Sequence, residues 1–112
     1  MVERGIALFN RGEYFACHEV LEEAWTPERG PRRLFLQSLI HVAVGFYHHQ
    51  RGNPAGAARQ LRKGLRKLDA YVPVCESVDT ARLQREVLLV LGRIEAGEEV
   101  AGYPRIHLGL VD

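Results

Sequence analysis

Three side chains near the start of the sequence have the types and the spacing of a metal-binding site. His18, Glu22 and Trp25 are separated by four and three residues, so on an α-helix they lie on one face. An imidazole and a carboxylate one helical turn apart can bind the same metal ion. The spacing therefore predicts a site on this helix face, with His18 and Glu22 as ligands.

A second polar stripe falls in a stretch of sequence that is otherwise apolar. Gln37, His41 and His48 are separated by four and seven residues, and at 100° per residue they lie within an arc of roughly 40° on one helix face. Burying a polar group without a partner costs about 1–3 kcal/mol, so these side chains need partners. The helix that carries His18 and Glu22 can supply them, because consecutive helices of a small bundle usually pack side by side.

Together the two stripes predict a binding site between two helices. The predicted metal ligands are His18, Glu22, His41 and His48, and the predicted lining of an adjacent ligand pocket is Trp25, Gln37 and Tyr47. Imidazole and carboxylate groups suit one divalent transition-metal ion, namely zinc, manganese or iron. A metal-dependent hydrolase would use Glu19 or Glu22 as its general base. Peptidase activity is not indicated, because glutamate at position 22 breaks the His-Glu-x-x-His pattern of zinc proteases.

The same residues admit a structural interpretation. Hydrogen bonds from His18 to Glu22 or to a backbone carbonyl, with similar bonds at Tyr47 and His48, would set the helix register without a metal. The protein would then be a non-catalytic helical interaction module that docks a peptide or a second subunit in an exposed groove. The metal site needs a ligand position that water can reach, whereas the module needs an exposed apolar patch.

The order of motifs along the first 70 residues is also informative. The motifs are Phe9–Phe15, His18–Trp25, Phe35–Val44, Tyr47-His48, Gly52-Asn53 and Gly56-Ala57. In this order they resemble the bacterial and archaeal domain-of-unknown-function family 309, over roughly residues 5 to 70. The resemblance implies a compact all-helical domain and a His-x-x-x-Glu-x-x-Trp/Tyr pattern proposed to bind metal, which falls on His18, Glu22 and Trp25. Members of the family often carry glutamine at the position of His41, which argues against His41 as an essential ligand.

Composition and charge limit the classes of partner. The 112 residues are 46% hydrophobic, and 15 basic against 14 acidic residues give a net charge of +1. This balance provides no field that would attract nucleic acid or an anionic membrane, and no apolar run approaches the ~20 residues of a membrane span. Two cysteines make no disulfide framework, and the first residues do not resemble a signal peptide. We therefore expect a cytoplasmic protein whose partner is a small molecule or another protein; a homodimer is plausible because so small a domain has a limited core.

Helical periodicity dominates the chain, and no stretch alternates strictly enough for a strand. The expected helices span residues 2–10, 13–25, 31–50, 53–71 and 78–97, with a linker over residues 73–77. Asn53 is expected to cap the fourth helix, and either Ser77 or Asp79 the fifth. The third helix is apolar on nearly every side and should be central.

These elements predict a single all-α domain over residues 1–112, a mostly antiparallel bundle of about five helices. A weak repeat, seen when Gly12 is laid over Gly52, suggests helical hairpins like those of tetratricopeptide repeats. The tail over residues 98–112 should be extended. It should pack along the bundle, because it contains the apolar residues Tyr103, Ile106, Leu108 and Leu110.

Overall fold

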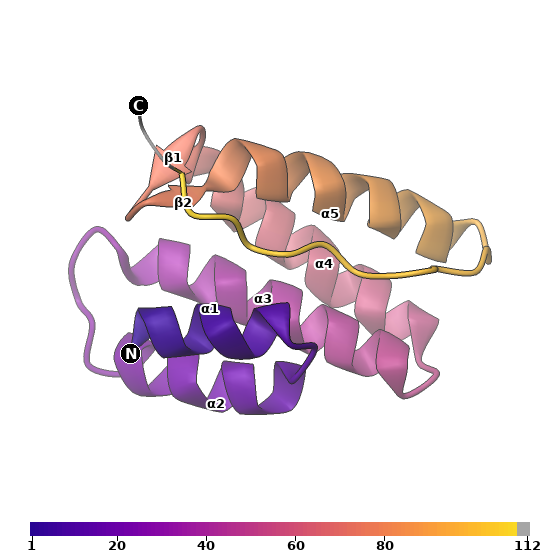
Figure 1. Cartoon of the computed structure of the whole chain (residues 1–112), viewed down its shortest axis with the longest axis horizontal. Coiled ribbons are helices and arrows are strands. Elements are labelled where there is room, and N and C mark those ends of the chain that lie inside the picture. The colour runs from indigo at the N-terminus through magenta and orange to yellow at the C-terminus, as the bar shows by residue number, and fades with distance from the viewer. Residues whose placement is uncertain (110–112) are drawn as a thin grey trace.

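The computed structural model describes residues 1–109 and contains five α-helices (Figure 1). The helices are α1 (Val2–Asn10), α2 (Tyr14–Trp25), α3 (Arg33–Gln50), α4 (Pro54–Leu68) and α5 (Thr80–Glu95). A 3-10 turn (Asp69–Tyr71) and two short antiparallel strands, β1 (Val74–Cys75) and β2 (Val78–Asp79), connect α4 to α5. The prediction of an all-α fold is confirmed. No helix among the described residues is long and apolar enough to cross a bilayer.

The turns from α1 to α2 and from α3 to α4 are built alike, as the alignment of Gly12 with Gly52 suggested. Both glycines have a φ angle of 76°, a left-handed conformation that glycine adopts without steric penalty. In each turn the next amide reaches back five residues: Glu13 N–H donates to the carbonyl of Leu8 at 3.0 Å, and the corresponding bond from residue 53 to residue 48 measures 2.9 Å. This pattern is the Schellman ending of a helix. The two helical hairpins are therefore closed by the same local device.

The structure confirms the predicted helix caps, but the segment that was predicted to be a linker forms part of a hairpin. The side chain of Asn53 accepts a hydrogen bond from Gly56 N–H at 3.0 Å, and Asp79 caps α5 through Arg82 N–H at 3.0 Å. The linker over residues 73–77 contributes to a β-hairpin, whose two turn residues, at positions 76 and 77, have φ angles of 49° and 66°. Such a turn usually contains asparagine or glycine. Its residues in this chain therefore carried no hairpin signal.

Helix α3 lies at the centre of the fold, packed against α2 on one side and α4 on the other. The core includes Phe35, Leu36, Leu39, Val42 and Phe46, all of which are fully buried. Helices α3 and α4 approach closely at two glycines. A Cβ atom at Gly45 would lie 2.7 Å from Leu61 Cδ2, and one at Gly64 would lie 2.8 Å from Val42 Cγ2. This close approach sets the position of α3 relative to α4.

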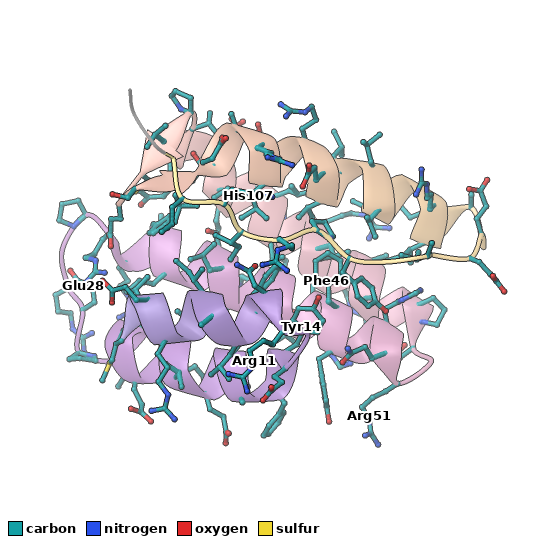
Figure 2. The ribbon with its side chains drawn as sticks, in the orientation of Figure 1. Arg11, Tyr14, Glu28, Phe46, Arg51 and His107 are labelled. Carbon is teal, nitrogen blue, oxygen red and sulfur yellow. The ribbon has the colours of Figure 1, made fainter. Side chains whose placement is uncertain are left out.

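The described part of the tail crosses the bundle as an extended segment, drawn in yellow in Figure 1. Asn10 holds it through two hydrogen bonds: its Nδ2–H donates to the carbonyl of Ile106 at 2.9 Å, and its Oδ1 accepts from Ile106 N–H at 2.7 Å. The ring of Tyr103 packs 4.9 Å from that of Phe46, which is labelled in Figure 2. The described part of the tail packs along the bundle as predicted, although Leu108 is 57% exposed. Leu110 lies outside the described residues.

Candidate functional site

His18 lies in a cleft between α2 and α3 that is lined mainly by rings. The cleft has a volume of about 140 Å³ and is lined by Tyr14, Phe15, His18, Val44, Tyr47 and His48. We call it the aromatic cleft. The centroid of the Phe15 ring lies 5.1 Å from the imidazole of His18 and 5.4 Å from the ring of Tyr47. About half of Phe15 is exposed, at 49%, so the aromatic cleft is open to solvent.

The hydrogen bonds of His18 determine which ring nitrogen faces Glu22. Nδ1 lies 3.0 Å from the backbone carbonyl oxygen of Phe15, and because a carbonyl can only accept, Nδ1 carries the hydrogen. In the neutral ring the lone pair is then on Nε2, which lies 3.5 Å from Oε1 of Glu22. The side chains of His18 and Glu22 are 21% and 50% exposed. The two predicted ligands on α2 therefore face each other where solvent can reach them.

Glu22 also lines a second hollow, together with three of the other predicted site residues. This hollow has a volume of about 120 Å³ and is lined by Glu22, Trp25, Gln37, Ile40 and His41. We call it the polar hollow. His41 is bonded across to α4, because its Nδ1–H donates to Oε1 of Gln60 at 2.8 Å. Its imidazole is thereby held by α4 and not by the residues of α2.

The surroundings of His41 favour its neutral form. Burial is the largest effect and lowers the pKa of His41 below its ordinary value of 6.5, and the nearby charges of Lys67, Lys63 and Arg66 lower the pKa further. The hydrogen bond that His41 donates to Gln60 acts in the opposite direction but is a smaller effect than burial. The ring is therefore neutral at pH 7, with one nitrogen donating to Gln60.

Trp25 forms one wall of the polar hollow and is held by Arg33. The guanidinium carbon of Arg33 lies 4.0 Å from the centroid of the indole ring, and Nη1 donates to the backbone carbonyl of Trp25 at 2.9 Å. Such stacking of a guanidinium on an indole is favourable. The indole Nε1–H is buried and has no hydrogen-bond partner among residues 1–109.

The four predicted metal ligands do not gather into one cluster. His48 shares the aromatic cleft with His18, whereas His41 lies in the polar hollow beside Glu22. Within residues 1–109, no group of three histidine, cysteine, aspartate or glutamate side chains is arranged to hold a metal ion. The physical reason is the length of α3: at 1.5 Å per residue, seven residues separate His41 from His48 by about 10 Å along the axis. Glu19 is exposed and lines neither space.

The His18–Glu22 pair does fit two ligands of one ion. Ligand atoms that each lie 2.0–2.2 Å from a tetrahedral zinc ion are roughly 3.3–3.6 Å apart, and Nε2 and Oε1 are 3.5 Å apart. Histidine ligands also commonly donate their other N–H to a backbone carbonyl, as His18 does to Phe15. The pair could thus supply two ligands, and the remaining coordination positions of an ion held there would face solvent.

Several residues that line or support the two spaces were not predicted from the sequence. Phe15 and Val44 line the aromatic cleft, and Gln60 and Arg33 hold His41 and Trp25. Helical spacing contained part of the signal. Phe15 precedes His18 by three residues and Val44 follows His41 by three, so each lies on the face of its helix that was already singled out.

Comparisons with known proteins show that the residues lining these two spaces lie in the part of the chain that matches a protein family. The family model described as "Domain of unknown function (DUF309)" matches residues 2–60, which include every residue that lines the aromatic cleft and the polar hollow. An uncharacterised protein of Bacillus subtilis (strain 168), YpuF, is 36% identical over 103 residues, or 89% of this chain. The chain spans 58% of the length of that relative. We conclude that the chain belongs to the DUF309 family.

Proposed function

We propose that this protein is a helical binding domain that holds one divalent transition-metal ion through His18 and Glu22. The observation that carries the proposal is the geometry of the pair, with Nε2 and Oε1 3.5 Å apart and Nδ1 bonded to the Phe15 carbonyl. Zinc, manganese and iron suit an imidazole–carboxylate pair. Since Glu22 is half exposed, water or a donor atom of a ligand can fill the remaining positions. The aromatic cleft beside His18 would then accept an apolar group of that ligand.

The arrangement supports binding better than hydrolysis. A bound ion would supply Lewis acidity and a more acidic water, but a hydrolase also needs a general base close to that water. When Glu22 serves as a ligand, the other predicted base is Glu19, whose side chain is exposed and lines neither space. We therefore propose a binding role for the pair.

Zinc affinity, measured by isothermal titration calorimetry on untagged protein, tests the proposal, with elemental mass spectrometry giving the stoichiometry. We expect one ion per chain. Loss of a residue that only supports a metal ligand typically lowers the affinity ten- to hundredfold. His18→Ala and Glu22→Gln each remove a ligand, so each should lower the zinc affinity by more than this. Glu19→Gln is the matched control, because it removes one exposed charge from the same helix and should leave the affinity unchanged. Equal zinc affinity in the parent, His18→Ala and Glu22→Gln proteins would contradict the proposal.

One observation favours a second function, the docking of a protein partner. The aromatic cleft, at about 140 Å³, is smaller than the roughly 300–1,000 Å³ of small-molecule pockets and close to the ~150 Å³ cavity that accepts a benzene ring. It therefore matches one apolar side chain of a partner. In this function the His18–Glu22 pair is a structural network, and the partner is a peptide or a second copy of the chain.

Sedimentation velocity tests whether the docked partner is a second copy of the chain. Under the docking function, Phe15→Ser should weaken self-association while zinc affinity, if any is measured, stays the same. A parent protein that sediments as a monomer up to high micromolar concentration would remove the second copy as the partner.

A further inference from the structure

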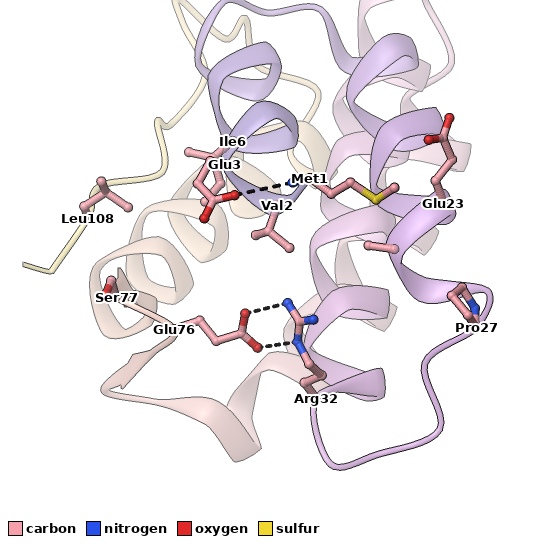
Figure 3. A pocket seen from close by; sticks show the side chains of 11 residues that line it. Met1, Val2, Glu3, Ile6, Glu23, Pro27, Arg32, Glu76, Ser77 and Leu108 are labelled. Carbon is pink, nitrogen blue, oxygen red and sulfur yellow. Dashed lines mark hydrogen bonds and ion pairs between the residues drawn. The ribbon is translucent and has the colours of Figure 1, made fainter.

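A cavity lies between α1, the end of α2, the β-hairpin and the tail (Figure 3). Its volume is about 740 Å³, and it shares no lining residue with the aromatic cleft or the polar hollow. That volume lies within the range of roughly 300–1,000 Å³ in which proteins bind small molecules. We call this space the terminal cavity.

Apolar side chains from three segments line much of the terminal cavity. Val2 and Ile6 come from α1, Ala24 from α2, and Leu108 from the tail. Leu108 remains 57% exposed, so the cavity presents apolar surface that the chain itself does not cover. An apolar group that entered the cavity would be removed from water, which is the main source of affinity in such sites.

The only guanidinium that lines the terminal cavity is already paired within the described chain. Nε and Nη2 of Arg32 donate to the two carboxylate oxygens of Glu76, each at 2.7 Å, and Figure 3 shows this two-bond contact. Glu76 reaches Arg32 from the hairpin turn, where it and Ser77 have positive φ angles of 49° and 66°. Residues other than glycine hold such angles only where surrounding contacts impose them. The Arg32–Glu76 contact therefore fixes one wall of the cavity and neutralises its arginine.

Two further carboxylates line the same cavity without a cationic side chain as partner. Glu3 contacts the amino group of Met1 at 3.4 Å, and among residues 1–109 neither Glu3 nor Glu23 forms an ion pair with a lysine, arginine or histidine side chain. Figure 3 shows Glu23 at the side of the cavity away from Leu108. The Met1 ammonium group also lines the cavity and balances Glu3, as Arg32 balances Glu76, so the carboxylate of Glu23 remains as the excess negative charge. Such a lining attracts a cation and repels an anion.

We propose that the terminal cavity binds a small organic cation, an ammonium or guanidinium group attached to a short apolar body. The apolar body contacts Val2, Ile6 and Leu108, and the cationic group lies near Glu23. This site is independent of the metal proposed at His18 and Glu22.

Three probes with the same six-carbon chain test this inference: hexylammonium, hexanol and hexanoate. Each is titrated into ¹⁵N-labelled metal-free protein, and the affinity is read from amide chemical-shift changes. We expect hexylammonium to bind most tightly and hexanoate most weakly, with the largest shifts at the amides of α1, the end of α2 and residues 106–109. Hexanol or hexanoate binding as tightly as hexylammonium would overturn the proposal, and so would shifts that map to other parts of the chain.

Charge-removing variants provide the second measurement. Glu3 and Glu23 are exposed, so proteins carrying Glu3→Gln and Glu23→Gln should fold normally. Removing an exposed charge pair weakens binding by about two- to fivefold, so the double variant should bind hexylammonium several-fold more weakly and hexanol unchanged. Glu99→Gln, an exposed residue that does not line the cavity, is the matched control. Equal hexylammonium affinity in the double variant and the control would also overturn the proposal.

Discussion

Nε2 of His18 lies 3.5 Å from Oε1 of Glu22, one turn further along α2. The two residues nevertheless line different spaces. His18 lines the aromatic cleft, and Glu22 lines the polar hollow with Trp25. His18, Glu22 and Trp25 therefore span both spaces. One helix face thus brings an imidazole and a carboxylate next to an apolar space and next to a polar one.

The first prediction concerns His41, which the sequence placed among the metal ligands. Its Nδ1–H is bonded to Gln60 on α4, away from His18. We expect His41→Gln to bind zinc within about twofold of the parent, since both ligands of the pair are retained. Isothermal titration calorimetry measures the affinity. A large loss in this variant would show that His41 does join His18 and Glu22 around the ion.

The second prediction is a dependence of stability on pH. Burial, the largest effect, lowers the pKa of His41 below 6.5 in the folded protein, so the unfolded chain takes up a proton at a higher pH than the folded one. The free energy of unfolding should therefore fall as the pH drops below about 6.5, until the pH passes the lowered pKa of the folded state. His41→Gln should remove this part of the pH dependence. Urea unfolding of both proteins between pH 7.5 and 5 gives the comparison, and parallel curves would contradict the prediction.

The third prediction concerns the bond between the tail and α1. Asn10→Ala removes both hydrogen bonds to Ile106 and leaves two partly buried backbone groups without partners. We expect a loss of about 1–3 kcal/mol in the free energy of unfolding. Gln50→Ala is the control, because it removes a single exposed bond of 3.2 Å to Gly12 and should change the stability by less than about 0.5 kcal/mol. Similar losses in the two variants would show that the tail contributes little.

The fourth prediction uses three glycines within helices. A Cβ atom at Gly45 would lie 2.7 Å from Leu61, and one at Gly64 would lie 3.0 Å from the carbonyl oxygen of Ser38, whereas a Cβ atom at Gly92 of α5 would meet nothing within 4 Å. Alanine at position 45 or 64 should therefore destabilise the protein by about 1–3 kcal/mol. Alanine at position 92 should stabilise it by about 0.5–1 kcal/mol. Thermal or urea unfolding gives the sign, and a stabilising Gly45→Ala would mean that α3 and α4 can separate at little cost.

Features that depend on neighbours within a few residues could be predicted from the local sequence. Helix periodicity, the caps at Asn53 and Asp79, and the turns at Gly12 and Gly52 all rest on interactions within one or two turns of chain. The contact between His18 and Glu22 belongs to the same class, because both residues lie on one helix. These features could be predicted without knowing how the helices pack.

The contacts between residues of different helices could not be predicted in this way. His41 shares a stripe with His48 on α3, yet it bonds Gln60, because α3 lies between two helices and its register against α4 is set by close packing at Gly45 and Gly64. The bonds from Asn10 to Ile106 join residues that are 96 positions apart. The spacing of residues within a helix determines which side chains share a face, but not which neighbour that face will contact. That choice depends on the packing of the whole core.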